Sequence, residues 1–61
     1  MPVITLEISK YPKEKKAALV KELVTKASEI TGVPAQAFVT LIKESDPDNV
    51  GLGTELLSDK H

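Results

Sequence analysis

Apolar and polar residues alternate along residues 3–8, VITLEI in sequence. Ile4, Leu6 and Ile8 fall on one face of an extended chain, whereas Thr5 and Glu7 fall with Val3 on the other. A period of two residues is typical of a strand that buries one face. We therefore expect a strand at 3–8.

A helical period follows. Pro12 suits the first position of a helix, where its missing N–H costs nothing. The apolar residues then recur at helical spacing and predict one broad stripe: Leu19, Val20, Leu23, Val24, Ala27 and Ile30. Glu22 and Lys26 have the favourable i,i+4 spacing for an ion pair. Gly32 and Pro34 predict that the helix ends at about residue 31.

Residues 37–44 read as a second strand with apolar residues on both faces. Phe38, Thr40 and Ile42 share one face, and Val39, Leu41 and Lys43 share the other. Such a strand is expected to be covered on two sides. Glu7 of the first strand is expected to pair with Lys43. Residues 45–49 form a turn, residues 54–58 a short strand or turn, and the polar tail is expected to fray.

Strand, helix and strand within about 44 residues make a βαβ unit, in which a right-handed crossover leaves the strands parallel. We expect an α+β fold and a single domain over residues 1–61. A two-stranded sheet under one helix leaves one sheet face and two edges open. With 61 residues and no cysteine, no disulfide stabilises the fold. The sequence therefore predicts a homo-oligomer whose sheets pack together.

Charge and composition exclude several functions. Eight lysines oppose nine acidic residues, so there is no general attraction to nucleic acid or to an anionic membrane. The single histidine, His61, is the last residue, and with no cysteine we expect no metal site. No apolar run is long enough to span a bilayer, and we expect no secretory signal because the start of the sequence lacks a basic segment followed by an apolar one. We expect a soluble cytoplasmic protein that needs no cofactor.

Pro2 is the residue with the most distinctive chemistry. Its small size favours removal of Met1, which would leave a secondary amine at the start of the first strand. The pKa of an α-amine is normally near 7.7–8.0, and burial or nearby cations lower it. A neutral amine at cellular pH can act as a general base. The structural alternative is that Pro2 only begins a strand, where proline is tolerated.

Three segments together resemble the 4-oxalocrotonate tautomerase family: Met1-Pro2-Val3-Ile4, Leu41-Ile42-Lys43-Glu44 and Asn49-Val50-Gly51-Leu52-Gly53. The resemblance spans nearly the whole chain. It implies a βαβ protomer that assembles as a hexamer, a trimer of dimers. It also implies that Pro2 is the general acid/base of a cofactor-free reaction that converts 2-hydroxydienoates to unsaturated ketones.

The sequence departs from the family where substrate is bound. The family holds substrate carboxylates with two arginines, whereas this chain contains no arginine. Val39 stands at one of those positions, and the other falls near Lys10 or Tyr11. Val50 stands where the family has an aromatic residue. We therefore predict substrate-binding positions at Lys10, Val39 and Val50, with Lys10 as the replacement cation and Lys13 and Lys43 as weaker candidates.

Two other functions stay open at the level of sequence. One is hydration or dehalogenation of an unsaturated acid by the same amine, which a protonated Pro2 would favour. The other is ligand binding or assembly without catalysis, which retention of Met1 would favour because acylation of the proline nitrogen removes the base. The tyrosine Tyr11 is expected either to donate a hydrogen bond to an anion or to pack over the start of the helix.

Overall fold

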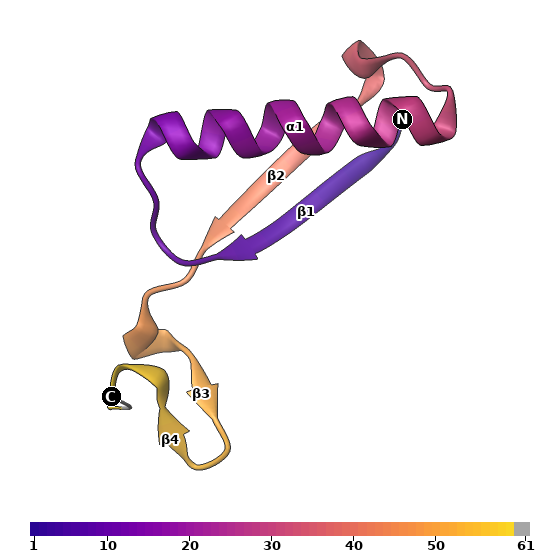
Figure 1. Cartoon of the computed structure of the whole chain (residues 1–61). Helices are drawn as coiled ribbons and strands as arrows, with labels where there is room; N and C mark the ends of the chain where they lie inside the picture. Colours follow the sequence, from indigo (N-terminus) through magenta and orange to yellow (C-terminus); the bar gives the residue numbers. More distant parts are fainter. Residues whose placement is uncertain (60–61) are drawn as a thin grey trace.

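The computed structural model describes residues 1–59 and shows one helix lying across a two-stranded sheet (Figure 1). The elements of this body are β1 (Val3–Ile8), α1 (Lys13–Thr31) and β2 (Val39–Glu44). β1 and β2 are parallel, in a register that places Val3 beside Val39 and Ile8 beside Glu44. A small antiparallel hairpin of β3 (Gly51–Leu52) and β4 (Glu55–Leu56) follows. The predicted βαβ fold is confirmed.

The ends of α1 follow from local chemistry. Pro12 caps the helix rather than beginning it, and its carbonyl accepts the N–H groups of Lys15 and Lys16 at 3.0 and 3.1 Å. At the other end Gly32 adopts a left-handed φ of 77°. Its N–H donates to the Ser28 carbonyl at 2.9 Å, which satisfies an acceptor that the helix would otherwise leave open.

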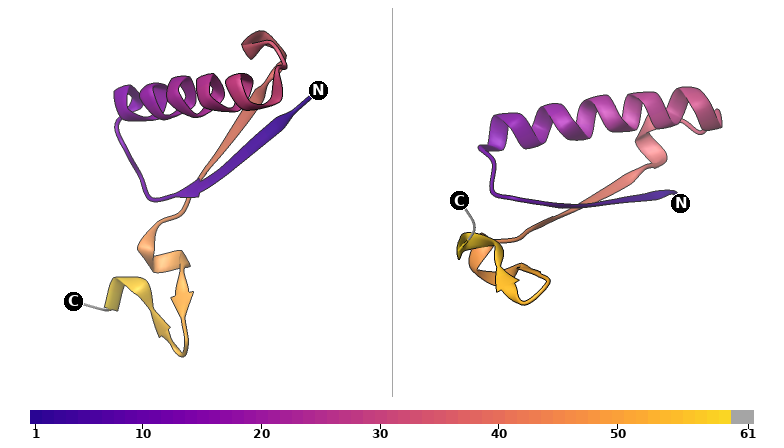
Figure 2. Two further views of the ribbon diagram at one scale, coloured as in Figure 1. Left: turned by 45° about the vertical axis from the view of Figure 1, so that its right-hand side comes forward. Right: turned by 60° about the horizontal axis from the view of Figure 1, so that its bottom comes forward.

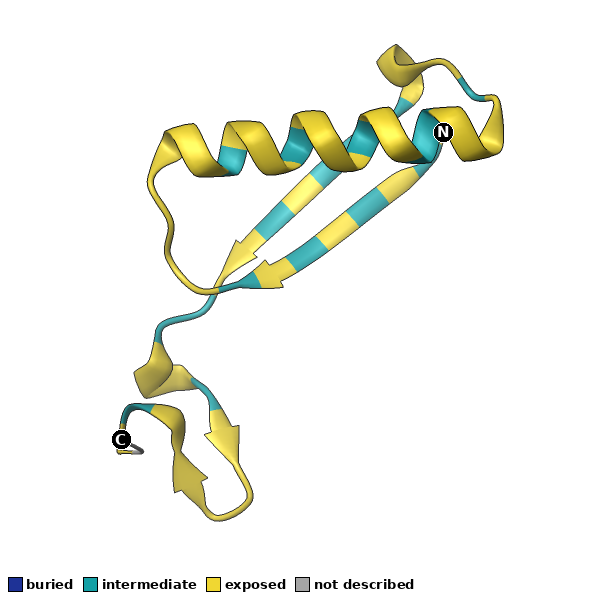
Figure 3. Ribbon diagram, in the orientation of Figure 1, coloured by how far each residue is buried: buried dark blue, intermediate teal, exposed yellow. Residues whose placement is uncertain are grey.

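The alternation in β1 divides the sheet into a covered and an open face. Ile4, Leu6 and Ile8 are half-buried under α1, whereas the residues between them are exposed, which Figure 3 shows as bands along the strand. In β2, Thr40 and Ile42 are half-buried, and Leu41 on the open face is 52% exposed. The chain thus covers only one of the two sheet faces with its own helix.

The second strand is shorter than its sequence pattern predicted. Residues Ala35–Ala37 form a single 3₁₀ turn, and β2 begins only at Val39. The N–H groups of Ala37 and Phe38 donate to the carbonyls of Pro34 and Ala35 at 2.9 and 3.1 Å. The 3₁₀ turn after Pro34 thus uses the two N–H groups that a longer strand would have donated to the sheet.

The helix stripe is narrower than predicted. Val20, Val24 and Ala27 are half-buried toward the sheet, but Leu19 and Leu23 lie at its margin and Ile30 is 77% exposed. Two strands are too narrow to cover the whole apolar stripe of a 19-residue helix.

Two ion pairs predicted from spacing do not form among the described residues. Lys26 pairs with Glu29 at 3.0 Å instead of with Glu22. Glu7 and Lys43 are neighbours in the strand register, yet they form no ion pair. Both side chains are exposed to solvent, where an ion pair contributes little to the free energy of unfolding.

The protomer has no closed core. No residue among 1–59 is buried, and the accessible surface is 4878 Å², against about 3,900 Å² for a compact monomer of this mass. The radius of gyration is 14.8 Å, against about 10.5 Å for a compact chain of this length. Figure 2 shows the cause, since the hairpin stands away from the sheet and helix.

No helix within residues 1–59 has the length and apolar content needed to cross a membrane. The frayed tail that the sequence predicted falls mostly on residues 60–61, outside the described residues.

Candidate active site

Pro2 is held at the first rung of the sheet. Its carbonyl accepts the N–H of Val39 at 3.0 Å, so its backbone is tied to β2 before β1 begins. Pro2 is half-buried, whereas Met1 is 90% exposed. Because Met1 projects into solvent, its removal would uncover the proline nitrogen without loss of a packing contact.

Val39 lies directly beside this position. It is half-buried and pairs in register with Val3, so the surroundings of Pro2 on the strands are apolar. The strands bring no lysine to this end of the sheet. Lys43 stands four positions further along β2, about 13 Å away at ~3.3 Å per residue.

Lys10 lies beyond the opposite end of the sheet. Six residue steps from Pro2 to Ile8 span about 20 Å of extended chain. The two further steps to Lys10 recover at most about 7 Å if the chain turns back. The Cα atoms of Pro2 and Lys10 are therefore on the order of 13 Å apart or more, beyond the reach of a lysine side chain.

Val50 lies at the same end as Lys10. It lines a shallow hollow of about 290 Å³ together with Ile8, Ser9 and Ser45 among others. The N–H of Leu57 donates to the Val50 carbonyl at 2.7 Å and folds the end of the hairpin over it. A single protomer thus brings Pro2 together with Val39 and places Lys10 and Val50 at the other end.

Tyr11 packs over the start of the helix, which is the second of the two arrangements that the sequence predicted for it. Its ring packs at the start of α1, where the Lys15 ammonium lies 5.9 Å from the ring centroid. A cation over an aromatic face is weakly attracted to it. Tyr11 is therefore engaged by the helix of its own protomer.

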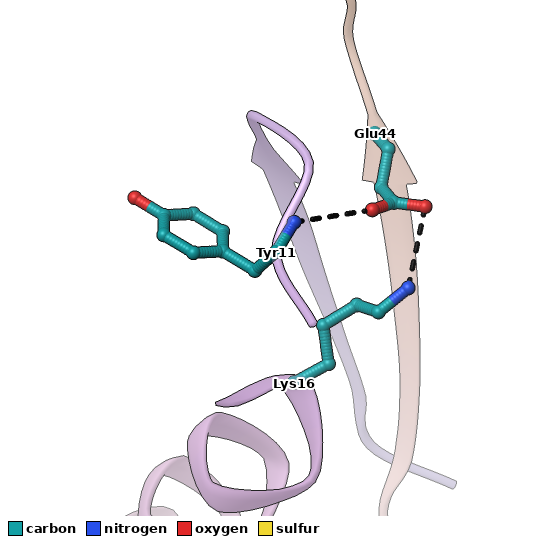
Figure 4. Close-up of polar contacts among 3 residues, drawn as sticks. All are labelled: Tyr11, Lys16 and Glu44. Atoms are coloured by element: carbon teal, nitrogen blue, oxygen red, sulfur yellow. Dashed lines mark hydrogen bonds and ion pairs between the residues drawn. The ribbon is translucent and has the colours of Figure 1, made fainter. Parts of the chain in front are cut away.

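Glu44 is a residue that the sequence analysis did not select. Its Oε2 accepts the backbone N–H of Tyr11 at 3.4 Å, and its Oε1 pairs with the Lys16 ammonium at 3.3 Å (Figure 4). No local pattern signals this contact, because Tyr11 and Glu44 are 33 positions apart in the sequence. The contact forms because the parallel register places the end of β2 beside the end of β1.

Comparison with known proteins decides the family. A family model described as "Tautomerase enzyme" matches residues 2–60 of the sequence. The chain belongs to the tautomerase family. The match begins at Pro2 and covers all the elements described above, so the resemblance seen in the sequence is confirmed. The comparison with curated proteins finds no match.

Solved structures agree with this tautomerase assignment. DmpI from Archaeoglobus fulgidus is 36% identical, with a TM-score of 0.87 over 95% of this chain and 100% of that one. The 4-oxalocrotonate tautomerase homologue TTHB242 is 32% identical, with a TM-score of 0.88 over 100% and 98%. A heterohexamer 4-oxalocrotonate tautomerase from Chloroflexus aurantiacus J-10-fl shares the fold at 21% identity, with a TM-score of 0.89 over 100% of both chains.

Proposed function

We propose that this tautomerase family protein is a cofactor-free keto–enol tautomerase that acts on a small enol or dienol carboxylic acid of the 2-hydroxymuconate type. The general acid/base is the amine of Pro2 after removal of Met1. The observation that carries the proposal is the anchoring of Pro2 to β2 by its own carbonyl, beside apolar Val39. A secondary amine so placed has a fixed position and a weakly polar surrounding.

The proposed reaction moves one proton and needs no other reactant. The neutral amine takes the proton of the substrate's enol hydroxyl and leaves a conjugated enolate. The resulting ammonium then returns the proton to a carbon of the conjugated system, which yields the unsaturated ketone. A rigid, half-buried base favours this transfer, because little reorganisation accompanies it.

The substrate carboxylate needs a cation, and the strands place none beside Pro2. We propose that Lys10 supplies it and that Val50 supplies apolar contact, both from a neighbouring copy of the chain. Lysine binds a carboxylate as a point charge and lacks the planar fork of arginine. The expected selectivity is therefore looser than in a site built with two arginines.

The proposed assembly is a homo-oligomer, a hexamer built as a trimer of dimers, of single-domain protomers spanning residues 1–61. The protomer's excess surface of about 1,000 Å² over a compact monomer supports association. So does the distance between Pro2 and Lys10, since a second copy can bring the two ends of the sheet together. A surface of that extent is sufficient for a specific interface.

The test is turnover by Met-free protein. We expect ketonisation of 2-hydroxymuconate or phenylenolpyruvate, with loss of activity in Pro2→Ala. A matched control is the same protein with Met1 retained, which mass spectrometry identifies, because an acylated proline nitrogen cannot accept a proton. Turnover that survives either change would contradict the role of Pro2. No turnover of either acid would contradict the proposed substrate class.

A further inference from the structure

The turn between β1 and α1, residues 9–12, is tied to the sheet by a single side chain. The Tyr11 N–H donates to Glu44 Oε2 at 3.4 Å (Figure 4). Among the described residues, this is the one hydrogen bond that residues 9–11 make. Apart from the covalent links at its two ends, the turn is therefore held to β2 by one carboxylate oxygen.

The other oxygen of Glu44 holds the carboxylate in place. Oε1 pairs with Lys16 of α1 at 3.3 Å, and the two side chains are only 28% and 32% exposed. The Lys26–Glu29 pair on the outside of the helix is 70% and 60% exposed. Ion pairs shielded from solvent are screened less by salt and water. In addition, the Ser45 N–H donates to the Ile8 carbonyl at 2.8 Å, so the ends of the two strands are fixed to each other.

The geometry assigns to Glu44 the role of a positioning residue for Lys10. The amide that donates to Glu44 lies in the peptide plane that joins Lys10 to Tyr11, and this plane includes the Lys10 Cα. Restraining the N–H therefore restrains the point from which the lysine side chain extends. This inference rests on the proposed function, in which Lys10 binds the substrate carboxylate.

A positioning role has a specific kinetic signature. The carboxylate of the substrate does not change during proton transfer, so Lys10 binds it equally well in the ground state and in the transition state. Loss of such uniform binding raises KM and leaves kcat nearly unchanged. A general loss of fold stability would instead lower the amount of active protein, which reduces apparent kcat without changing KM.

Two substitutions distinguish the effect of the length of the Glu44 side chain from the effect of its charge. Glu44→Asp keeps the charge but shortens the side chain by one methylene, which takes the carboxylate out of range of a bond already 3.4 Å long. Glu44→Gln keeps the length and the acceptor but loses the charge. We expect KM to rise about tenfold in Glu44→Asp and to stay within about threefold of wild type in Glu44→Gln, with kcat within about twofold in both. Glu29→Asp shortens the acid of the exposed pair and should change neither constant.

Two further measurements make the role of Glu44 separable from that of Pro2. Hydrogen exchange at the Tyr11 amide should accelerate in Glu44→Asp and not in Glu44→Gln, whether or not the protein turns over substrate. In a Lys10→Ala background, the KM effect of Glu44→Asp should disappear, because the two residues act as one unit.

Three results would overturn the inference. The first is equal Tyr11 exchange in wild type and Glu44→Asp. The second is a KM rise in Glu44→Gln that exceeds the rise in Glu44→Asp, which would assign the effect to the ion pair with Lys16. The third is a KM rise that persists without Lys10. Turnover that survives Pro2→Ala would contradict the proposed function alone, since the exchange result does not depend on it.

Discussion

Replacing Leu41 by lysine should break the proposed assembly, in which the open sheet face of one protomer is covered by another. Leu41 lies in the middle of β2, 52% exposed in the protomer, on the face that α1 does not cover. Complete burial of a leucine side chain contributes about 1.5–3 kcal/mol, so covering its exposed half contributes roughly 1 kcal/mol per subunit. A lysine there forfeits this and adds the cost of an unpaired charge in an apolar interface, several kcal/mol. In a symmetric assembly the penalty repeats in every copy.

The assay is molar mass in solution at micromolar concentration. The proposed hexamer of 6.6 kDa subunits has a mass of about 40 kDa, and Leu41→Lys should move the mass to a smaller species. The matched control is Ile30→Lys, since Ile30 is 77% exposed at the end of α1, on the helix side of the protomer. Its mass should equal that of wild type. A monomeric wild-type chain, or a Leu41→Lys variant with unchanged mass, would contradict an assembly through the open sheet face.

Three other substitutions test the end of the helix, the proposed cation of the site and the position beside Pro2. Gly32→Ala should lower the free energy of unfolding by about 1 kcal/mol, because a left-handed φ of 77° disfavours a Cβ even though no atom lies within 4 Å of that position. Denaturant titration measures this, and an unchanged midpoint would contradict it. Lys10→Ala should lower kcat/KM about 10–100-fold through loss of a charge-assisted contact worth about 1.5–3 kcal/mol, and an unchanged kcat/KM would remove Lys10 from the site. Val39→Arg should lower KM for a carboxylate substrate, because it adds a cation beside Pro2; a KM at or above the wild-type value would argue against a substrate carboxylate there.

Local patterns were sufficient to predict the main elements of the fold. The period of two in β1 and the position of Gly32 depend on short-range chemistry, and the parallel pairing of β1 with β2 follows from the general preference of strand–helix–strand units. The prediction that residues 37–38 belong to the second strand was wrong, because the turn after Pro34 takes the donors that a strand would need. The apolar alternation alone gives no sign that the turn and the strand compete for the same N–H groups.

The site was predictable only in part. The parallel register places Val39 beside Pro2, so one protomer brings together two of the four residues that the sequence analysis assigned to the site. It also separates them from Lys10 and Val50, because both of these follow the carboxyl ends of the strands. The contact of Glu44 with Tyr11 was not predicted, because the two residues are 33 positions apart and a glutamate at the end of a strand is ordinarily solvated. Long-range pairings of this kind depend on the tertiary register and leave no local signal.

The role of Pro2 as the general base is tested most sharply by an NMR titration of its amine in Met-free protein, set beside the pH dependence of kcat/KM. A general base must be neutral to accept a proton, so activity should fall as pH drops through the pKa of this amine. We expect the pKa of the Pro2 nitrogen to coincide with the pKa that governs the acidic limb of the rate profile. A Pro2 amine that stays protonated throughout the pH range of activity would contradict it.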